Sequence, residues 1–292
     1  MNPLDPRRGS ALVAGAALLW SSSGLFIKVL SLGPLAIAGF RSAVAAAAMV
    51  LALRLLGRPV RLRPDLLGAG AAAAYAGLLV AFVGATKLTT AANAIFLQFS
   101  APIYLVLLEP LVLKTPVRAR DLAAVGFSLG GMALFFLGRL ERGHLGGNLL
   151  GILSGLFLAT FTLLLKVKRE REPGSDPVGA IILGNILVAL LCLPTGLQGP
   201  MPGAREAFLL LYLGVFQIAV AYLLFNAGMR HLSATAALVV GTLEAVLNPV
   251  WVYLGTGEKP GGWALLGGIV VLLSVAWYAL AAPAREPPLP DS

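Results

Sequence analysis

Residues 238–254, LVVGTLEAVLNPVWVYL, form an apolar run with one ionisable side chain, Glu244, near its centre. Positions three or four apart share a helical face, which aligns four side chains of this stretch: Gly241, Glu244, Asn248 and Trp251. A charge at the centre of a bilayer costs about 2.5–3.5 kcal/mol on insertion scales, and it usually faces a cavity or a partner. Glu244 therefore either contacts a substrate or a coupling proton, or it is protonated or hydrogen-bonded to backbone that Pro249 leaves free.

Aromatic and amide side chains elsewhere in the chain are candidates to complete such a cavity. Tyr75 and Phe82 share a helical face, as do Tyr222 and Phe225, and such pairs favour an apolar pocket with few polar groups. In the first half, the positions that match the Glu244 stripe are Gln98, Ala101, Tyr104 and Leu105, so the carboxylate has no counterpart there. We predict nine cavity residues: Trp20, Tyr75, Phe82, Asn93, Gln98, Tyr222, Glu244, Asn248 and Trp251.

Other polar and small residues have structural interpretations. Asn93 is a candidate for helix packing as well as for binding, and Ser21, Ser22 and Ser23 permit close packing. Arg41 is expected to snorkel outward, to pair with a helix end or to contact substrate. We expect Glu109 to form an ion pair with the basic loop 113–120. Small residues spaced four apart predict close helix contacts at Gly126 and Gly130, and at Gly147, Gly151 and Gly155.

The composition places these residues in a membrane protein. The chain has 292 residues, of which 58% are hydrophobic and 12% are charged, and its mean hydropathy is +0.88. Soluble domains are about 45–50% apolar and about 25% charged. The net charge of +9 does not indicate nucleic acid binding, because the basic residues lie in short gaps between apolar runs. The single cysteine, Cys192, excludes an internal disulfide.

Runs of about 20 apolar residues predict ten membrane-spanning helices. They are 11–30, 34–56, 65–86, 90–112, 120–138, 148–167, 177–193, 206–227, 233–254 and 262–281. With the N-terminus inside, fifteen Lys and Arg residues lie on the inner side and six on the outer side, and Arg41 lies within a span. The excess of positive charge inside predicts that both termini are cytoplasmic.

The chain also repeats itself. FVGATKLTTAANAIFLQFSAP, 82–102, is similar to FNAGMRHLSATAALVVGTLEA, 225–245, and Lys28 aligns with Lys166 in the first helix of each half. Five spans in each half is an odd number, so the second half must enter the membrane inverted. Inverted repeats are typical of transporters that bind substrate near the midplane. We predict repeats at 10–138 and 148–282, a linker at 139–147 and a cytoplasmic tail at 283–292.

Two stretches resemble the EamA repeats of the drug/metabolite transporter superfamily. The first, 15–46, has Trp20, Lys28, Pro34 and Phe40-Arg41 at the matching positions. The second, 229–274, has the pair Leu243-Glu244, the turn Gly257-Glu258-Lys259-Pro260, and Gly267-Gly268. Two residues depart from the pattern: Ala245 stands where the family often has Pro, and Thr115 occupies the turn position that Glu258 holds in the second repeat.

The resemblance implies an all-α polytopic protein of ten helices that exports small metabolites or drugs. Within the family, the amino acid exporters, including the aromatic amino acid exporter, are the first members to consider. We expect a bacterial inner-membrane exporter of neutral or aromatic amino acids that works by alternating access, needs no cofactor or metal, and is not an enzyme. Its partners are a small-molecule substrate and the lipid bilayer, with protons as candidate coupling ions and no nucleic acid. The sequence leaves the oligomeric state open and is compatible with a monomer.

Two alternatives stay open at this stage. The first is a carrier of drugs, nucleobases or sugar derivatives. A sugar phosphate would call for several cationic residues in mid-span, and only Arg41 meets that condition. The second is a membrane-embedded enzyme or lipid-handling scaffold, which would call for paired catalytic groups at one depth.

Overall fold

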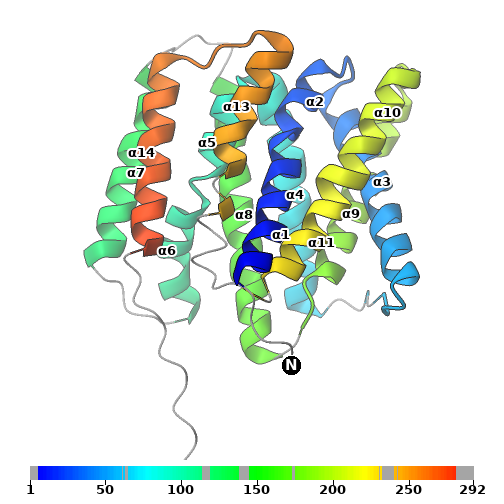
Figure 1. Cartoon of the computed structure of the whole chain (residues 1–292), viewed down its shortest axis with the longest axis horizontal. Helices are drawn as coiled ribbons and strands as arrows, with labels where there is room; N and C mark the ends of the chain where they lie inside the picture. Colours follow the sequence, from blue (N-terminus) through cyan, green and yellow to red (C-terminus); the bar gives the residue numbers. More distant parts are fainter. Residues whose placement is uncertain are drawn as a thin grey trace, which may run out of the picture.

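Every regular element that the structure describes is helical (Figure 1). This computed structural model describes residues 6–60, 62, 65–113, 119–137, 145–172, 175–229, 231, 240–241 and 243–280. Within these ranges, seven helical segments are long and apolar enough to cross a membrane: Arg7–Val29, Pro34–Leu55, Leu66–Leu88, Ala91–Val112, Leu145–Arg171, Val178–Leu197 and Ala204–Gly228. A shorter apolar helix occupies Gly262–Ser274. The protein is a multi-pass membrane protein on this evidence.

In the described residues, the first half of the chain supplies seven helices. They are α1 (Pro6–Ser21), α2 (Ser23–Val29), α3 (Pro34–Leu55), α4 (Leu66–Leu88), α5 (Ala91–Gln98), α6 (Ala101–Leu113) and α7 (Ala119–Leu137). The second half supplies α8 (Leu145–Arg171), α9 (Val178–Leu197), α10 (Ala204–Tyr212), the π-helix η1 (Leu213–Val220), α11 (Ala221–Gly228), α13 (Leu243–Thr256) and α14 (Gly262–Leu280).

Three of the expected spans are not single regular α-helices. The first divides at Ser22 into α1 and α2, and the expected span 90–112 divides at Phe99–Ser100 into α5 and α6. The expected span 206–227 contains η1, and π-helical turns often occur at functional sites. The expected linker, tail and the start of the span 233–254 lie largely outside the described residues, as does Thr115.

The two halves pack against each other with pairwise symmetry. Two helices meet their own counterparts, α3 with α9 and α7 with α14. The contact of α4 with α8 is matched by that of α11 with α1, and the contact of α4 with α9 is matched by that of η1 with α3. Helices α5 and α6 pack on α8 as α13 packs on α1 and α2. This pattern is what two structurally equivalent repeats produce.

The halves also run in opposite directions. We call the end at which α1 begins the near face, and the opposite end, where α2 finishes, the far face (Figure 1). Asn148, at the start of α8, bonds to Thr89 at the far end of α4, while Lys168, close to the end of α8, bonds to Asp65 at the near end of α4. Because α1 starts at the near face and α8 starts at the far face, the first helices of the two halves are antiparallel.

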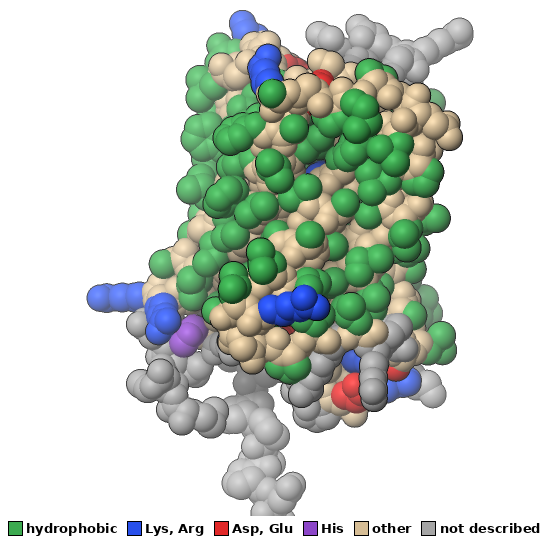
Figure 2. Space-filling model, turned by 90° about the vertical axis from the view of Figure 1, so that its right-hand side faces the viewer, with side chains coloured by type: hydrophobic (Ala, Val, Ile, Leu, Met, Phe, Trp, Pro, Cys, Tyr) green, Lys and Arg blue, Asp and Glu red, His purple; other side chains and the backbone are tan. Residues whose placement is uncertain are grey.

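Hydrophobic side chains cover the sides of the molecule, and charges gather towards its ends. Figure 2 shows one side, on which a broad apolar band separates Lys and Arg side chains at the two ends. Large apolar side chains that are exposed include those of Leu51, Leu190, Leu191 and Phe208. Such a surface is suited to lipid and unsuited to water.

Glycines set the closest helix contacts, although not all of those expected. A Cβ on Gly147 would lie 2.6 Å from the backbone carbon of Leu88, and one on Gly151 or Gly155 would lie 3.0 Å from Leu97 atoms. The expectation for Gly126 and Gly130 was wrong as far as the described residues show, because none of their atoms lies within 4 Å of a Cβ built there. The neighbouring Gly131 makes the contact instead, since its Cβ would lie 3.0 Å from the carbonyl oxygen of Gly267. A one-residue difference in helix rotation separates the two outcomes.

Candidate functional site

Aromatic rings from both halves meet in the interior. The ring centroid of Trp20 on α1 lies 5.0 Å from that of Tyr222 and 5.2 Å from that of Phe225, both on α11. Tyr75 on α4 joins the same group, at 5.4 Å from Tyr222 and 5.1 Å from Phe161 on α8. Edge-on and tilted rings at these distances pack favourably. We call these five residues the aromatic cluster.

The aromatic cluster lies at mid-depth. Trp20 and Tyr75 both lie near the middle of segments that are long enough to cross the membrane. Tyr75 is fully buried, whereas Trp20 and Tyr222 are half-buried. Three of the nine predicted cavity residues, Trp20, Tyr75 and Tyr222, are thus brought together, and the cluster forms where α1 and α4 of the first half meet α8 and α11 of the second.

Arg41 lies beside the aromatic cluster rather than at the membrane surface. It is 1% exposed, and its Nη2 donates to the Leu79 carbonyl oxygen of α4 at 3.2 Å. Its electrostatic neighbours are the hydroxyl groups of Tyr75 and Tyr222. The expectations that Arg41 snorkels or pairs with a helix end were therefore wrong. Packing of α3 against α4 and α9 encloses the side chain before it can reach either end.

Glu244 faces the same cluster from α13. Its carboxylate is an electrostatic neighbour of the Tyr222 hydroxyl, and the side chain is half-buried. No hydrogen bond joins Glu244 to another residue that the structure describes. The alternative in which Glu244 bonds to backbone freed by Pro249 is thus not realised within the described residues. A carboxylate and a guanidinium are therefore both electrostatic neighbours of one tyrosine.

The remaining polar members of the Glu244 stripe contact the first span. Asn248 is fully buried, and its Nδ2 donates to the Ser23 hydroxyl at 3.4 Å. Trp251 Nε1 donates to the Ser21 hydroxyl at 3.0 Å. A Cβ on Gly24 would lie 2.3 Å from Asn248 Oδ1, so only glycine allows this approach. These two predicted cavity residues therefore hold α13 against α1 and α2.

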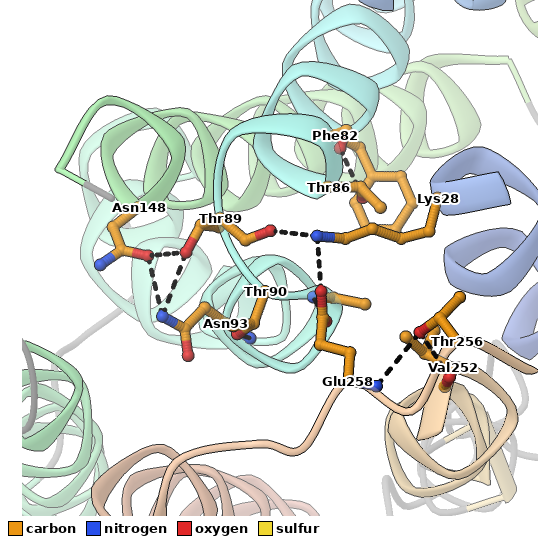
Figure 3. A network of polar contacts seen from close by, with 11 residues as sticks. Lys28, Phe82, Thr86, Thr89, Thr90, Asn93, Asn148, Val252, Thr256 and Glu258 are labelled. Carbon is orange, nitrogen blue, oxygen red and sulfur yellow. Dashed lines mark hydrogen bonds and ion pairs between the residues drawn. The ribbon is translucent and has the colours of Figure 1, made fainter. Parts of the chain in front are cut away.

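A polar network links the halves at the far face (Figure 3). Lys28 Nζ forms an ion pair with Glu258 at 2.7 Å and donates to the Thr89 carbonyl oxygen at 2.7 Å. Glu258 Oε1 accepts from the Ala91 backbone N–H at 2.8 Å. Lys28 and Thr89 belong to the first half, whereas Glu258 lies in the turn between α13 and α14 of the second.

Asn93 belongs to this far-face network rather than to the aromatic cluster. Its Nδ2 donates to Thr89 Oγ1 at 3.2 Å and to Asn148 Oδ1 at 3.1 Å (Figure 3). Thr89 Oγ1 also donates to Asn148 Oδ1, at 2.8 Å. Phe82 is buried in the hydrophobic core one turn below, and its carbonyl oxygen accepts from Thr86. Gln98 ends α5, and its buried Oε1 has no hydrogen-bond partner among the described residues.

Ion pairs also join the halves at the near face. Lys166 of α8 lies 2.9 Å from Glu109 of α6, and Lys168 pairs with Asp65 before α4. The expected partner of Glu109, the loop 113–120, is replaced by a helix of the other half as far as the described residues show. The hydrogen bond from Lys168 holds the pKa of Asp65 below its usual value. Asp65 also caps α4 by accepting from the Gly68 N–H at 3.0 Å.

Sequence reasoning missed three residues of the mid-depth site. Arg41 was not among the predicted cavity residues, although a lone charge in an apolar span was a usable signal. Phe161 carries no such signal, because it is an ordinary apolar residue within its helix, whereas Asn185 of α9, which lies next to Tyr75, is a polar residue in an apolar run. Their places follow from the packing of α8 and α9 on α4.

Comparison with known proteins defines the class of this molecule. The model of the EamA-like transporter family matches residues 7–137 and again 145–280, so each half of the chain corresponds to one repeat. The chain belongs to the EamA-like transporter family.

Individual relatives agree with this assignment. The chain is 28% identical over 276 residues to an uncharacterized transporter of Archaeoglobus fulgidus, covering 93% of this chain and 97% of the relative. It is 26% identical over 297 residues to the uncharacterized transporter YwfM of Bacillus subtilis, covering 95% of each. A crystal structure that is 17% identical superposes with a TM-score of 0.66 and covers 96% of this chain and 100% of the other, which shows a shared fold.

Proposed function

We propose that this membrane transporter exports neutral amino acids, above all aromatic ones, across the bacterial inner membrane. The observation that carries the proposal is the aromatic cluster, in which rings from both repeats pack together near one buried cation, Arg41, and one carboxylate, Glu244. Aromatic rings offer an apolar surface to a planar side chain, and rings pair favourably with rings. Most of a small-molecule site is apolar, with a few polar groups that fix orientation.

The proposal includes ten spans, cytoplasmic termini and repeats at 10–138 and 148–282. Helices α7, α13 and α14 would complete the ten spans beside the seven long apolar segments. With the near face cytoplasmic, the basic residues that begin α1 and end α8 lie inside, in agreement with the positive-inside rule. The far face would then be external.

Alternating access is the proposed mechanism, and two ion pairs support it. Lys28 of α2 pairs with Glu258, and its sequence counterpart Lys166 of α8 pairs with Glu109. Each pair joins the first span of one repeat to the end of the fourth span of the other repeat. Along α8, Asn148 of the far-face network and Lys166 are about 27 Å apart at 1.5 Å per residue. The two pairs therefore sit at opposite faces and are suited to hold each face closed in turn.

Transport measurements test the proposal. Purified protein in liposomes should move labelled phenylalanine, tryptophan and tyrosine faster than empty liposomes do, and unlabelled aromatic amino acids should compete. Tyr222→Ala should reduce this uptake strongly because it removes the ring that contacts Trp20 and Tyr75. Phe208→Ala, on the exposed side of α10, is the matched control and should leave it unchanged. Failure to move any member of a broad amino acid panel would overturn the substrate assignment.

A further inference from the structure

The hydrogen-bonding capacity of Arg41 is largely unused. A guanidinium stays protonated and carries five N–H donors in a rigid fork. Arg41 is fully buried, yet its hydrogen bond in the structure goes to one backbone carbonyl, and its Nε has no partner among the described residues. A buried ion is strongly penalised unless an opposite charge and further hydrogen bonds compensate for its lost hydration. No carboxylate of the described residues forms an ion pair with Arg41.

Other buried polar atoms without partners lie around the same position. The Tyr75 hydroxyl, an electrostatic neighbour of Arg41, has no partner that meets hydrogen-bond geometry. Asn185 of α9 lies next to Tyr75; its Nδ2 donates to the Ile181 carbonyl oxygen, but its Oδ1 has no partner that meets hydrogen-bond geometry. Buried polar groups in native proteins are nearly all hydrogen-bonded, so several unsatisfied atoms around one cation indicate a binding site.

The chemistry of this site selects an anion with two acceptor oxygens. The guanidinium fork matches a carboxylate, to which it can donate two parallel hydrogen bonds. The Tyr75 hydroxyl can donate a further hydrogen bond to the same group. Tyr222 has Arg41 as one electrostatic neighbour and Glu244 as another, so a positive and a negative charge both act on one tyrosine. That arrangement is complementary to a zwitterion whose side chain lies on the aromatic cluster.

We propose that Arg41 binds the carboxylate of the transported substrate, with its ammonium group towards Glu244. This inference rests on the proposed function and deepens it, because it makes a carboxylate a requirement for binding. Arg41 is 1% exposed and Tyr75 is 0% exposed, so the substrate reaches this position only when the two repeats separate. Until then the subsite is closed to water. A charged hydrogen bond is stronger in such a water-free interior than in water.

Three ligands of one shape test the inference in the wild-type protein. Phenylalanine carries both charges, phenethylamine lacks the carboxylate, and 3-phenylpropionate lacks the ammonium group. Hydrogen bonds to charged groups contribute about 1.5–3 kcal/mol, so phenylalanine should bind about tenfold to a hundredfold more tightly than phenethylamine. Titration calorimetry on purified protein measures the three dissociation constants. Equal affinity for phenylalanine and phenethylamine would overturn the inference without affecting the proposed function.

Substitution of Arg41 supplies the second half of the test. Arg41→Gln should remove most of the difference between phenylalanine and phenethylamine by weakening phenylalanine alone. Arg41→Lys, which keeps the charge but not the fork, should give an intermediate loss and guards against misfolding of the glutamine variant. Arg54→Gln, on an exposed position of the same helix, is the matched control and should change neither ligand. An equal loss for both ligands would assign Arg41 to structure and refute the subsite.

Two further outcomes separate the subsite from the proposed function. Binding of 3-phenylpropionate but of no amino acid, lost in Arg41→Gln, would retain the carboxylate subsite and overturn amino acid transport. If chloride binds to the wild-type protein but not to Arg41→Gln, and phenylalanine binds equally well to both, an inorganic anion occupies this position and the inference is overturned. Absence of binding for every carboxylate and every amino acid would refute both proposals.

Discussion

Removal of charge from the Lys28–Glu258 ion pair should favour opening of the far face. Glu258→Gln is the sharpest change, because the amide oxygen can still accept from the Ala91 N–H while the charge that faces Lys28 is lost. The two side chains are 18% and 24% exposed, between a surface pair and a buried one. An exposed pair contributes about 0.2–1 kcal/mol and a charged hydrogen bond about 1.5–3 kcal/mol. We therefore expect a loss of about 1 kcal/mol, which corresponds to about a fivefold shift towards the open state.

Cysteine accessibility measures this shift. The chain has one cysteine, Cys192, so Cys192→Ala provides a background without reactive thiols. Thr86 is 0% exposed beneath the far-face network, and Thr86→Cys should react with a membrane-impermeant maleimide only when that face opens (Figure 3). In oriented vesicles, Glu258→Gln should raise the labelling rate from the far face about fivefold.

The near-face pair provides the matched control for this experiment. Glu109→Gln removes the same charge from the near-face pair with Lys166, the sequence counterpart of Lys28; the side chains of Glu109 and Lys166 are 30% and 29% exposed. By weakening the opposite face, it should slow the labelling of Thr86→Cys from the far side. Acceleration by both variants would mean that each only loosens the fold, and no change in either would mean that the pairs do not hold the faces closed. Both results contradict the proposed gates.

Three other predictions concern packing, coupling and pH. Gly147→Ala should lower the free energy of unfolding by about 1–3 kcal/mol because its Cβ meets backbone at 2.6 Å. Gly126→Ala should not, because no atom of the described residues lies within 4 Å of its Cβ. Thermal unfolding in detergent compares the two variants. If Glu244 couples protons, Glu244→Gln should abolish the pH dependence of transport while substrate exchange persists, and unchanged pH dependence would assign it to structure. Because Lys168 lowers the pKa of Asp65, this pair stabilises the fold at pH values above the usual pKa of Asp, and the stabilisation is lost as the pH falls through the lowered pKa. Asp65→Asn should therefore flatten the dependence of the free energy of unfolding on pH in that window. An unchanged pH dependence would refute the stabilising role of the pair.

Much of the architecture could be predicted from residue types alone. Apolar runs located the long spanning segments, since helices must satisfy their own backbone in lipid. The alignment of Lys28 with Lys166 indicated two equivalent halves, and the structure places each lysine in an ion pair with the other half. Breaks at Ser22 and at Phe99–Ser100 were not predicted, because hydropathy averaged over about 20 residues does not register a local change in helix direction.

The site was predicted less completely for a different reason. Helical spacing aligned Glu244, Asn248 and Trp251 on one stripe, but it could not say which neighbour each would meet. The structure divides them: Glu244 faces the aromatic cluster, while Asn248 and Trp251 bond to serines of the first span. A stripe on one helix is wide enough to touch two different neighbours, and only their positions decide between them.

The sequence by itself determined that this chain crosses a membrane as repeated apolar helices and that Glu244 would be a rare charge within them. Those conclusions depend on the transfer of side chains from water to lipid, which is a local property of each segment. Only the tertiary structure decided that Arg41 lies beside Tyr75 and Tyr222, and that the two lysine ion pairs lie at opposite faces. These depend on contacts between residues far apart in the chain. Hydropathy locates the spanning helices, but the rotation of each packed helix sets which residues meet.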